Sequence, residues 1–78
     1  MNKMIIGENA GKVWRFLSNN AGHKYEFHEM SQTLGLTVPA LAAAIGWLAR
    51  EDKVEIEFVQ KDGTSEIAYI YLTLNVYF

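Results

Sequence analysis

The segment spanning residues 37–58 constrains the fold most, because its hydrophobic spacing changes from that of a helix to that of a strand. Leu41, Ile45 and Leu48 lie three or four residues apart and therefore share one face of a helix. After a charged turn, hydrophobic residues alternate with glutamates, as in a half-buried strand, at Val54, Ile56 and Phe58. The segment predicts a helix that leads directly into a strand.

A second, short helix is expected just before this one. Residues 28–34 predict that helix, and Gly35 is suited to end it in the left-handed conformation. Thr37 can cap the long helix, while Pro39 falls in its first turn, where the missing N–H is not needed. A helix end, a tight connection and a helix start in such close succession are typical of a helix-turn-helix.

The remaining segments complete a small α+β domain. Hydrophobic residues on one face predict a first helix over about 6–17, and residues 25–27 predict a short bridging strand. Residues 61–63 are a hairpin signal, and a returning strand is expected over about 66–74. We therefore predict a winged helix-turn-helix, with three helices plus a small antiparallel sheet with a β-hairpin wing. The predicted bounds are 1–78 for the single domain, about 28–52 for the helix-turn-helix and about 54–74 for the wing.

The core is expected to combine the inward faces of the helices and of the wing strands. Its predicted members are Ile6, Ala10, Val13, Leu17, Met30, Leu34, Leu41, Ile45, Leu48, Val54, Ile56, Phe58 and Ile70. A domain of 78 residues buries only a modest core, and without cysteine it has no disulfide or Cys-based zinc site to supplement it. Gly7 and Gly11 are four residues apart on the first helix, a spacing that predicts a point of close helix packing.

The chain is mildly acidic, with a formal net charge of -2. Domains that bind nucleic acid are usually basic, because neutralisation of phosphates supplies most of their non-specific affinity. The seven lysines and arginines of this chain form no run. No apolar stretch has the length of a membrane span, and the apolar start of the chain is too short for a signal peptide. We expect a cytoplasmic protein with no membrane association.

Two segments resemble a known family: residues 6–14, which read IGENAGKVW, and residues 45–53, which read IGWLAREDK. They are similar to the best-marked segments of a small, uncharacterised family of stand-alone winged helix-turn-helix proteins from Bacteroides-type bacteria. The resemblance covers nearly the whole chain, to about residue 74. It implies a winged-helix fold and, by analogy with the wider superfamily, a role in binding DNA. It implies no catalytic or ligand-binding residues.

The predicted recognition helix has few of the side chains that read DNA. Direct readout in the major groove relies mainly on Arg, Lys, Asn and Gln. This helix has no Asn or Gln, its N-terminal half is mostly alanine, and its basic residues lie at its C-terminal end. If the chain is a DNA-binding transcriptional regulator, its contacts would come from Thr37, Ala42, Arg50, Lys53 and Lys61.

The same helix favours a protein contact. Small residues beside Trp47, including Ala43, would form a flat apolar surface, and tryptophan is enriched at the centres of protein interfaces. A third interpretation is an unused surface whose alanines reflect helix propensity alone. We favour a non-catalytic winged-helix module that acts through protein contacts, including self-association, with the DNA-binding regulator as the alternative.

Residues 67–78 carry no charged side chain. Alternation would give a strand there two apolar faces, whereas a wing strand on a monomer needs only one. Natural edge strands also carry charges or proline that discourage pairing. We predict a homodimer with Tyr69, Tyr71, Val76, Tyr77 and Phe78 in or beside its interface. The alternative is that the C-terminal segment folds back over the first helix.

No residue pattern predicts catalysis. His28 and Glu29 begin like the HExxH zinc motif, but Gln32 stands where the second histidine would be, and glutamine is a poor zinc ligand. No serine lies in the context of a nucleophile elbow, and no glycine-rich phosphate loop follows a strand. We expect no enzyme activity, catalytic residue, metal site, cofactor or small-molecule substrate.

Overall fold

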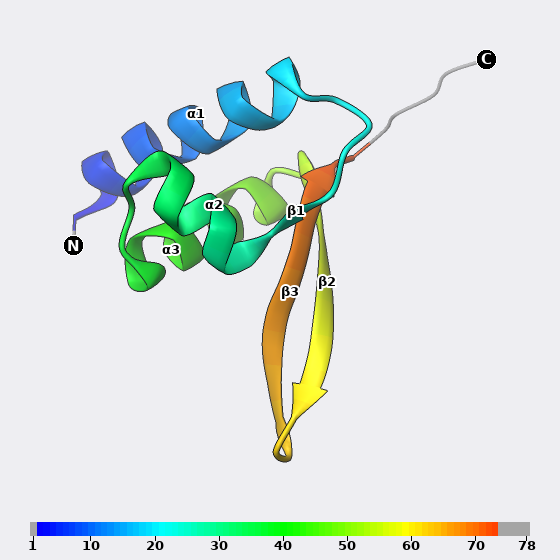
Figure 1. Cartoon of the computed structure of the whole chain (residues 1–78). Helices are drawn as coiled ribbons and strands as arrows, with labels where there is room; N and C mark the ends of the chain where they lie inside the picture. The colour runs from blue at the N-terminus through cyan, green and yellow to red at the C-terminus, as the bar shows by residue number, and fades with distance from the viewer. Residues whose placement is uncertain (1, 74–78) are drawn as a thin grey trace.

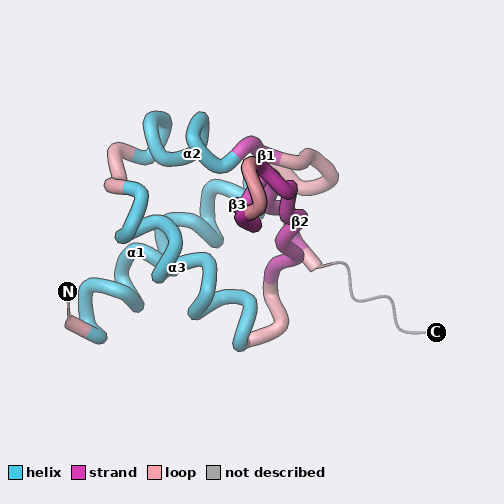
Figure 2. Tube along the Cα trace, turned by 90° about the horizontal axis from the view of Figure 1, so that it is seen from below, coloured by secondary structure: helices cyan, strands magenta, loops and turns pink. Residues whose placement is uncertain are grey.

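The computed structural model describes residues 2–73 as three helices and a three-stranded antiparallel sheet (Figure 1). The elements in chain order are α1 (Lys3–Asn19), β1 (Tyr25–Glu26), α2 (Phe27–Leu34), α3 (Val38–Arg50), β2 (Val54–Lys61) and β3 (Thr64–Leu72). The strand order is β1-β3-β2, with both pairings antiparallel. The helices gather on one side of the sheet (Figure 2), and the β2–β3 hairpin projects beyond them as a wing. The predicted α+β winged-helix architecture is confirmed.

The connection between α2 and α3 forms as its residues predict. Gly35 takes a φ of 66°, and the N–H of Leu36 donates to the Ser31 carbonyl at 3.0 Å, which closes α2. The Thr37 hydroxyl then accepts from the Ala40 N–H at 3.2 Å and caps α3. Backbone groups at the end of α2 and at the start of α3 therefore find hydrogen-bond partners within one short turn. This turn fixes the start of α3.

One contiguous core joins all three helices to the sheet. Its buried hydrophobic residues are Ala10, Val13, Leu17, Phe27, Met30, Leu41, Ala44, Ile45, Leu48, Val54 and Ile70. Nine of them were predicted, whereas Phe27 and Ala44 were not. Ile6, Leu34 and Ile56, which were also predicted, are only half-buried. Phe27 was expected in the bridging strand, but that strand ends at Glu26 and Phe27 opens α2 facing the core.

The prediction that Phe58 belongs to the core is wrong, since its side chain is 62 % exposed. The pairing of β2 with β3 shifts between Glu57 and Phe58, so that Glu57 faces Tyr69 and Phe58 faces Ile67. Beyond this bulge the hairpin extends past the helices (Figure 1). Phe58 therefore continues the strand alternation, but no helix lies over it there.

The predicted close packing at Gly7 and Gly11 is also wrong. A Cβ atom at Gly7 would have nothing within 4 Å, and one at Gly11 would meet only the Arg15 side chain at 3.4 Å. Helix α1 also begins earlier than expected, because the Asn2 side chain accepts from the Ile5 N–H at 2.9 Å and caps it.

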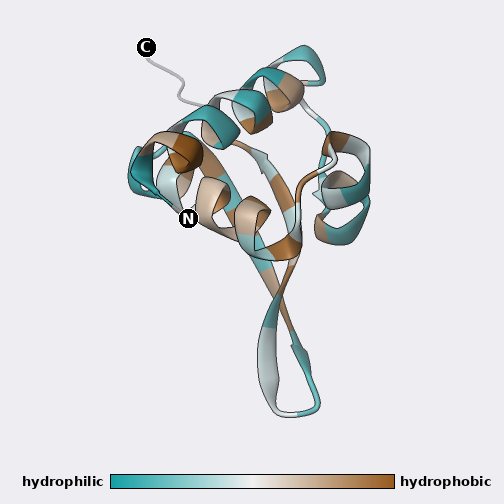
Figure 3. Ribbon diagram, turned by 90° about the vertical axis from the view of Figure 1, so that its left-hand side faces the viewer, coloured by the Kyte–Doolittle hydropathy of each residue, from teal (hydrophilic) through white to brown (hydrophobic). Residues whose placement is uncertain are grey.

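The wing itself is a tight hairpin. Lys61 pairs with Thr64, so only two residues form the turn, and both have positive φ: 51° at Asp62 and 80° at Gly63. These angles are those of a type I′ turn, which matches the twist of the flanking strands. Hydrophobic colouring is concentrated where the hairpin meets the helices and gives way to polar colouring at the tip (Figure 3).

Replacing Thr37 with alanine should lower the free energy of unfolding by about 1 kcal/mol, because the α3 cap loses its side-chain acceptor. Urea unfolding followed by circular dichroism measures the change. Thr33→Ala is the matched control, since Thr33 is exposed within α2 and caps nothing. Equal effects of the two substitutions would contradict the assigned role of the Thr37 hydroxyl.

Candidate interaction surface

The outward face of α3 is smooth and nearly uncharged. Thr37 and Gly46 are exposed, and Ala40, Ala42 and Ala43 between them are half-buried. Trp47 stays 40 % exposed and is therefore not folded away into the core. The proposed protein contact through Ala43 and Trp47 thus starts from side chains that solvent can reach.

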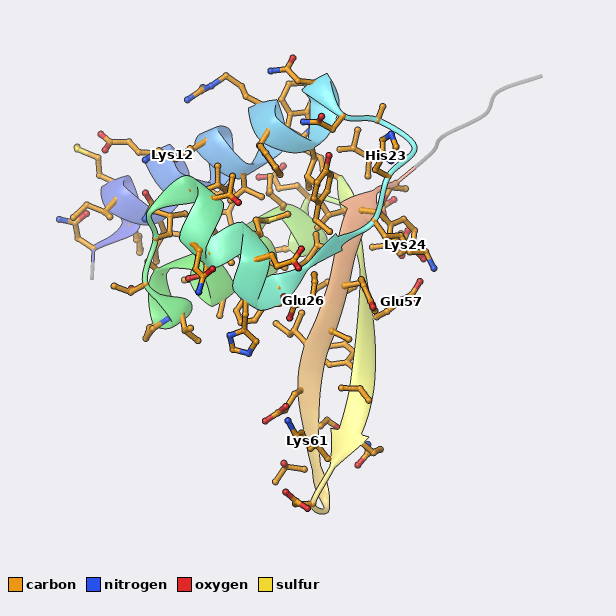
Figure 4. All side chains as sticks on the ribbon, viewed as in Figure 1. Lys12, His23, Lys24, Glu26, Glu57 and Lys61 are labelled. Carbon is orange, nitrogen blue, oxygen red and sulfur yellow. The ribbon has the colours of Figure 1, made fainter. Side chains whose placement is uncertain are left out.

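The basic residues proposed for DNA binding do not form one patch. Arg50 lies at the C-terminal end of α3, about 20 Å along the helix from the Thr37 cap, because a helix rises about 1.5 Å per residue. The Lys53 ammonium lies 5.9 Å from the centre of the Trp14 ring, over α1. Lys61 is near the far end of the wing (Figure 4). Lys61 therefore lies far from Arg50 and Lys53, which are three residues apart at the end of α3.

Acidic residues outnumber basic ones in this half of the molecule. Between residues 37 and 73 the only cations are Arg50, Lys53 and Lys61. The anions in the same range are Glu51, Asp52, Glu55, Glu57, Asp62 and Glu66. The formal charge of residues 37–73 is therefore negative, whereas phosphate contacts need positive charge.

A groove runs between the helices and the wing. A cavity of about 550 Å³ lies between the start of α2 and both wing strands, and its lining includes Glu26, Phe58 and Lys61. A second cavity of about 220 Å³ adjoins it and is lined by Phe27, His28, Val38, Ala42, Glu66 and Ile67. Three residues line both cavities: His28, Glu66 and Ile67. We call the two cavities together the wing groove.

Two carboxylates at one end of the wing groove have defined partners. Glu57 forms an ion pair with Lys24, the only one among residues 2–73 (Figure 4). The Glu57 carboxylate, as hydrogen-bond acceptor, raises the pKa of Lys24. Glu26 caps α2, accepting from the Glu29 N–H at 2.8 Å, and this bond holds the pKa of Glu26 below its ordinary value.

The outer face of the sheet carries the tyrosines predicted for self-association. Tyr69 is 42 % exposed and pairs with Glu57, while Tyr71 is half-buried and pairs with Glu55. The Lys24 ammonium lies 5.3 Å from the centre of the Tyr71 ring and covers part of it. Val76, Tyr77 and Phe78, the other predicted interface residues, lie outside the described residues.

The predicted site residues thus fall on more than one surface. Ala42, Lys61 and Tyr69 line the wing groove. Arg50 and Trp47 line a third cavity near the C-terminal end of α3. Sequence reasoning missed the groove itself, because its walls come from three segments distant in the chain. The one available signal was Phe58, an apolar residue close to a hairpin turn.

Within residues 2–73, no three side chains among His, Cys, Asp and Glu gather closely enough to hold a metal ion. No single described helix has the length and apolar character of a membrane span. Only α2 and α3 taken together, bent by 107°, satisfy that test of length and composition.

The fold and its capped α2–α3 turn define a winged helix-turn-helix domain. The chain belongs to the family described as "Winged helix-turn-helix domain (DUF2582)", which it matches over residues 1–72. This family membership confirms the resemblance seen in the two sequence segments.

Two relatives illustrate the similarity. Uncharacterized protein MJ1608 of Methanocaldococcus jannaschii is 39% identical over 57 residues, which cover 73% of this chain and 77% of that protein. The solution NMR structure of protein BT2368 from Bacteroides thetaiotaomicron is similar with a TM-score of 0.69 and 43% identity. That match covers 92% of this chain and 79% of the other.

The charge of Glu26 should make stability depend on pH in the acid range. Because its pKa is lower in the folded chain, its ionised form favours folding above its ordinary value of 4.5. This contribution is lost as the pH falls through the folded-state value. Carbon-detected NMR of the side-chain carboxyl should give a pKa below 4.5, and Glu26→Gln should weaken the acid dependence of unfolding. An unshifted carboxyl pKa would contradict the capping role.

Proposed function

We propose that this chain is a non-catalytic winged-helix module of the cytoplasm that acts through protein contacts, including contacts with a second copy of itself. The observation that carries the proposal is the exposure of large apolar side chains on α3 and the wing. They are Val38 (44 %), Trp47 (40 %), Phe58 (62 %), Val59 (47 %) and Tyr69 (42 %). Three more, Met4, Ile5 and Trp14, lie on α1, so α3 and the wing carry five of the eight exposed large apolar side chains among the described residues, an excess that favours a protein interface there.

The composition of these surfaces also supports the proposal. Cores of protein interfaces are rich in aromatic residues and poor in charge, which fits Trp47 with its neighbouring alanines. Two tyrosines, Tyr69 and Tyr71, lie on the outer face of the sheet, where a second chain can reach Tyr69. Aromatic residues of this kind supply much of the binding energy in interfaces of limited area.

DNA binding is the competing function. Its support is the helix-turn-helix geometry, with Thr37 and Ala42 on the N-terminal half of α3. The excess of carboxylates in the wing and in its connection to α3 weighs against it. Among residues 37–73, phosphates would meet six carboxylates and only three cations. We therefore rank protein contact above DNA contact.

Self-association is tested by measuring the mass of the full chain in solution across a range of concentrations. The expected result is a shift from one chain to two as the concentration rises. Tyr69→Ala should weaken the dimer by about thirtyfold, since losing an interface aromatic costs about 2 kcal/mol. Sedimentation equilibrium provides the dissociation constants.

Met4→Ala is the matched control, because Met4 is an apolar residue that is 74 % exposed on α1, away from the sheet. It should leave the dimer unchanged. A chain that stays monomeric at all concentrations, or a dimer that Tyr69→Ala leaves intact, would count against self-association through this face.

A further inference from the structure

We propose that the wing groove binds an extended segment of a partner protein that carries both basic and apolar side chains. This inference rests on the proposed function and names the chemistry of one partner. The groove adjoins the tyrosine face, since Tyr69 is also one of its lining residues.

The floor of the wing groove is apolar and open. Phe58 is 62 % exposed and Val38 is 44 % exposed, although both belong to regular elements of the fold. Ile67 and Ala42 lie in the same groove and are half-buried. Covering these side chains would remove apolar surface from water, which favours binding in proportion to the area covered.

The strand edge beside the groove favours an extended occupant. Strand β1 pairs with only two residues of β3, Ile70 and Tyr69, before the chain turns into α2. Along residues 64–68, no described strand pairs with β3 on the β1 side. An extended segment lying in line with β1 would meet free backbone groups there, which is the mode of recognition called β-augmentation.

The charge of the groove favours a basic occupant. Its lining includes three carboxylates, on Glu26, Glu57 and Glu66, and one cation, Lys61. Lys24 offsets Glu57 by their ion pair, but Glu66 has no ion-pair partner among residues 2–73 and lines both cavities. A lysine or arginine of the partner beside Glu66 would give charge complementarity, which guides binding and selects the partner. A second copy of this acidic groove would be repelled.

The test is an NMR titration of the isotope-labelled full chain with a short synthetic peptide of alternating lysine and valine. We expect chemical shift changes concentrated at the groove residues, such as His28, Ala42 and Ile67. The peptide in which glutamate replaces lysine should bind at least tenfold more weakly, because its charge repels Glu66. Either equal response to the two peptides or no response of the groove would overturn the proposal.

Charge-reversed variants sharpen the test. Glu66→Lys should weaken binding of the lysine peptide about fivefold or more, as expected for losing one exposed ion pair and adding a repulsion. Glu8→Lys makes the same charge change on an exposed position of α1, outside the groove, and should leave the affinity nearly unchanged. Equal losses for both variants would show a non-specific charge effect and would overturn the proposal.

Failure of this inference is distinguishable from failure of the proposed function. If the groove does not bind the peptide but the chain still dimerises, the proposed groove partner is ruled out and the protein-contact function is retained. Salt-sensitive binding of a DNA duplex to α3 would instead remove the proposed function itself. Spectra of both variants that keep the dispersion of the parent chain show that each variant is folded.

Discussion

The burial of one face of α3 is the constraint on which the rest of the structure depends. Leu41, Ala44 and Ile45 are fully buried and Leu48 is 3 % exposed, so this face is closed to solvent along the whole helix. A helix that buries one face must present the other. The same packing that creates the core therefore exposes the alanine-rich side of α3 with Trp47. Because this side has few of the side chains that read DNA, we propose a protein partner for it.

The end of α3 then sets the position of the wing. Asp52 takes a φ of 59°, and the N–H of Lys53 donates to the Leu48 carbonyl at 2.9 Å, which turns the chain directly into β2. Ile70, fully buried in β3, pairs with Ile56 on one side and Tyr25 on the other. The hairpin is therefore anchored at its base, and its outer half extends past the helices and leaves the wing groove open.

Local sequence patterns correctly predicted the features that depend on residues close together in the chain. The Gly35 and Thr37 signals gave the α2–α3 turn, because capping involves residues close in the chain. Phe58 was misassigned because alternation reports only the face of a strand and cannot show where the covering helices end. The wing groove was missed for a related reason: Val38, Glu66 and other lining residues come from distant segments, and only the folded chain brings them together.

We propose above all that α3 and the wing contact protein in preference to DNA. The most direct test of this proposal is an NMR titration of the labelled full chain with a mixed-sequence DNA duplex at low salt, where even weak phosphate binding is strongest. The account predicts no shifts over α3 or the wing tip at high duplex concentration. Shifts at Thr37, Arg50 and Lys61 that disappear as salt is added would contradict it and establish this face as a DNA-binding surface.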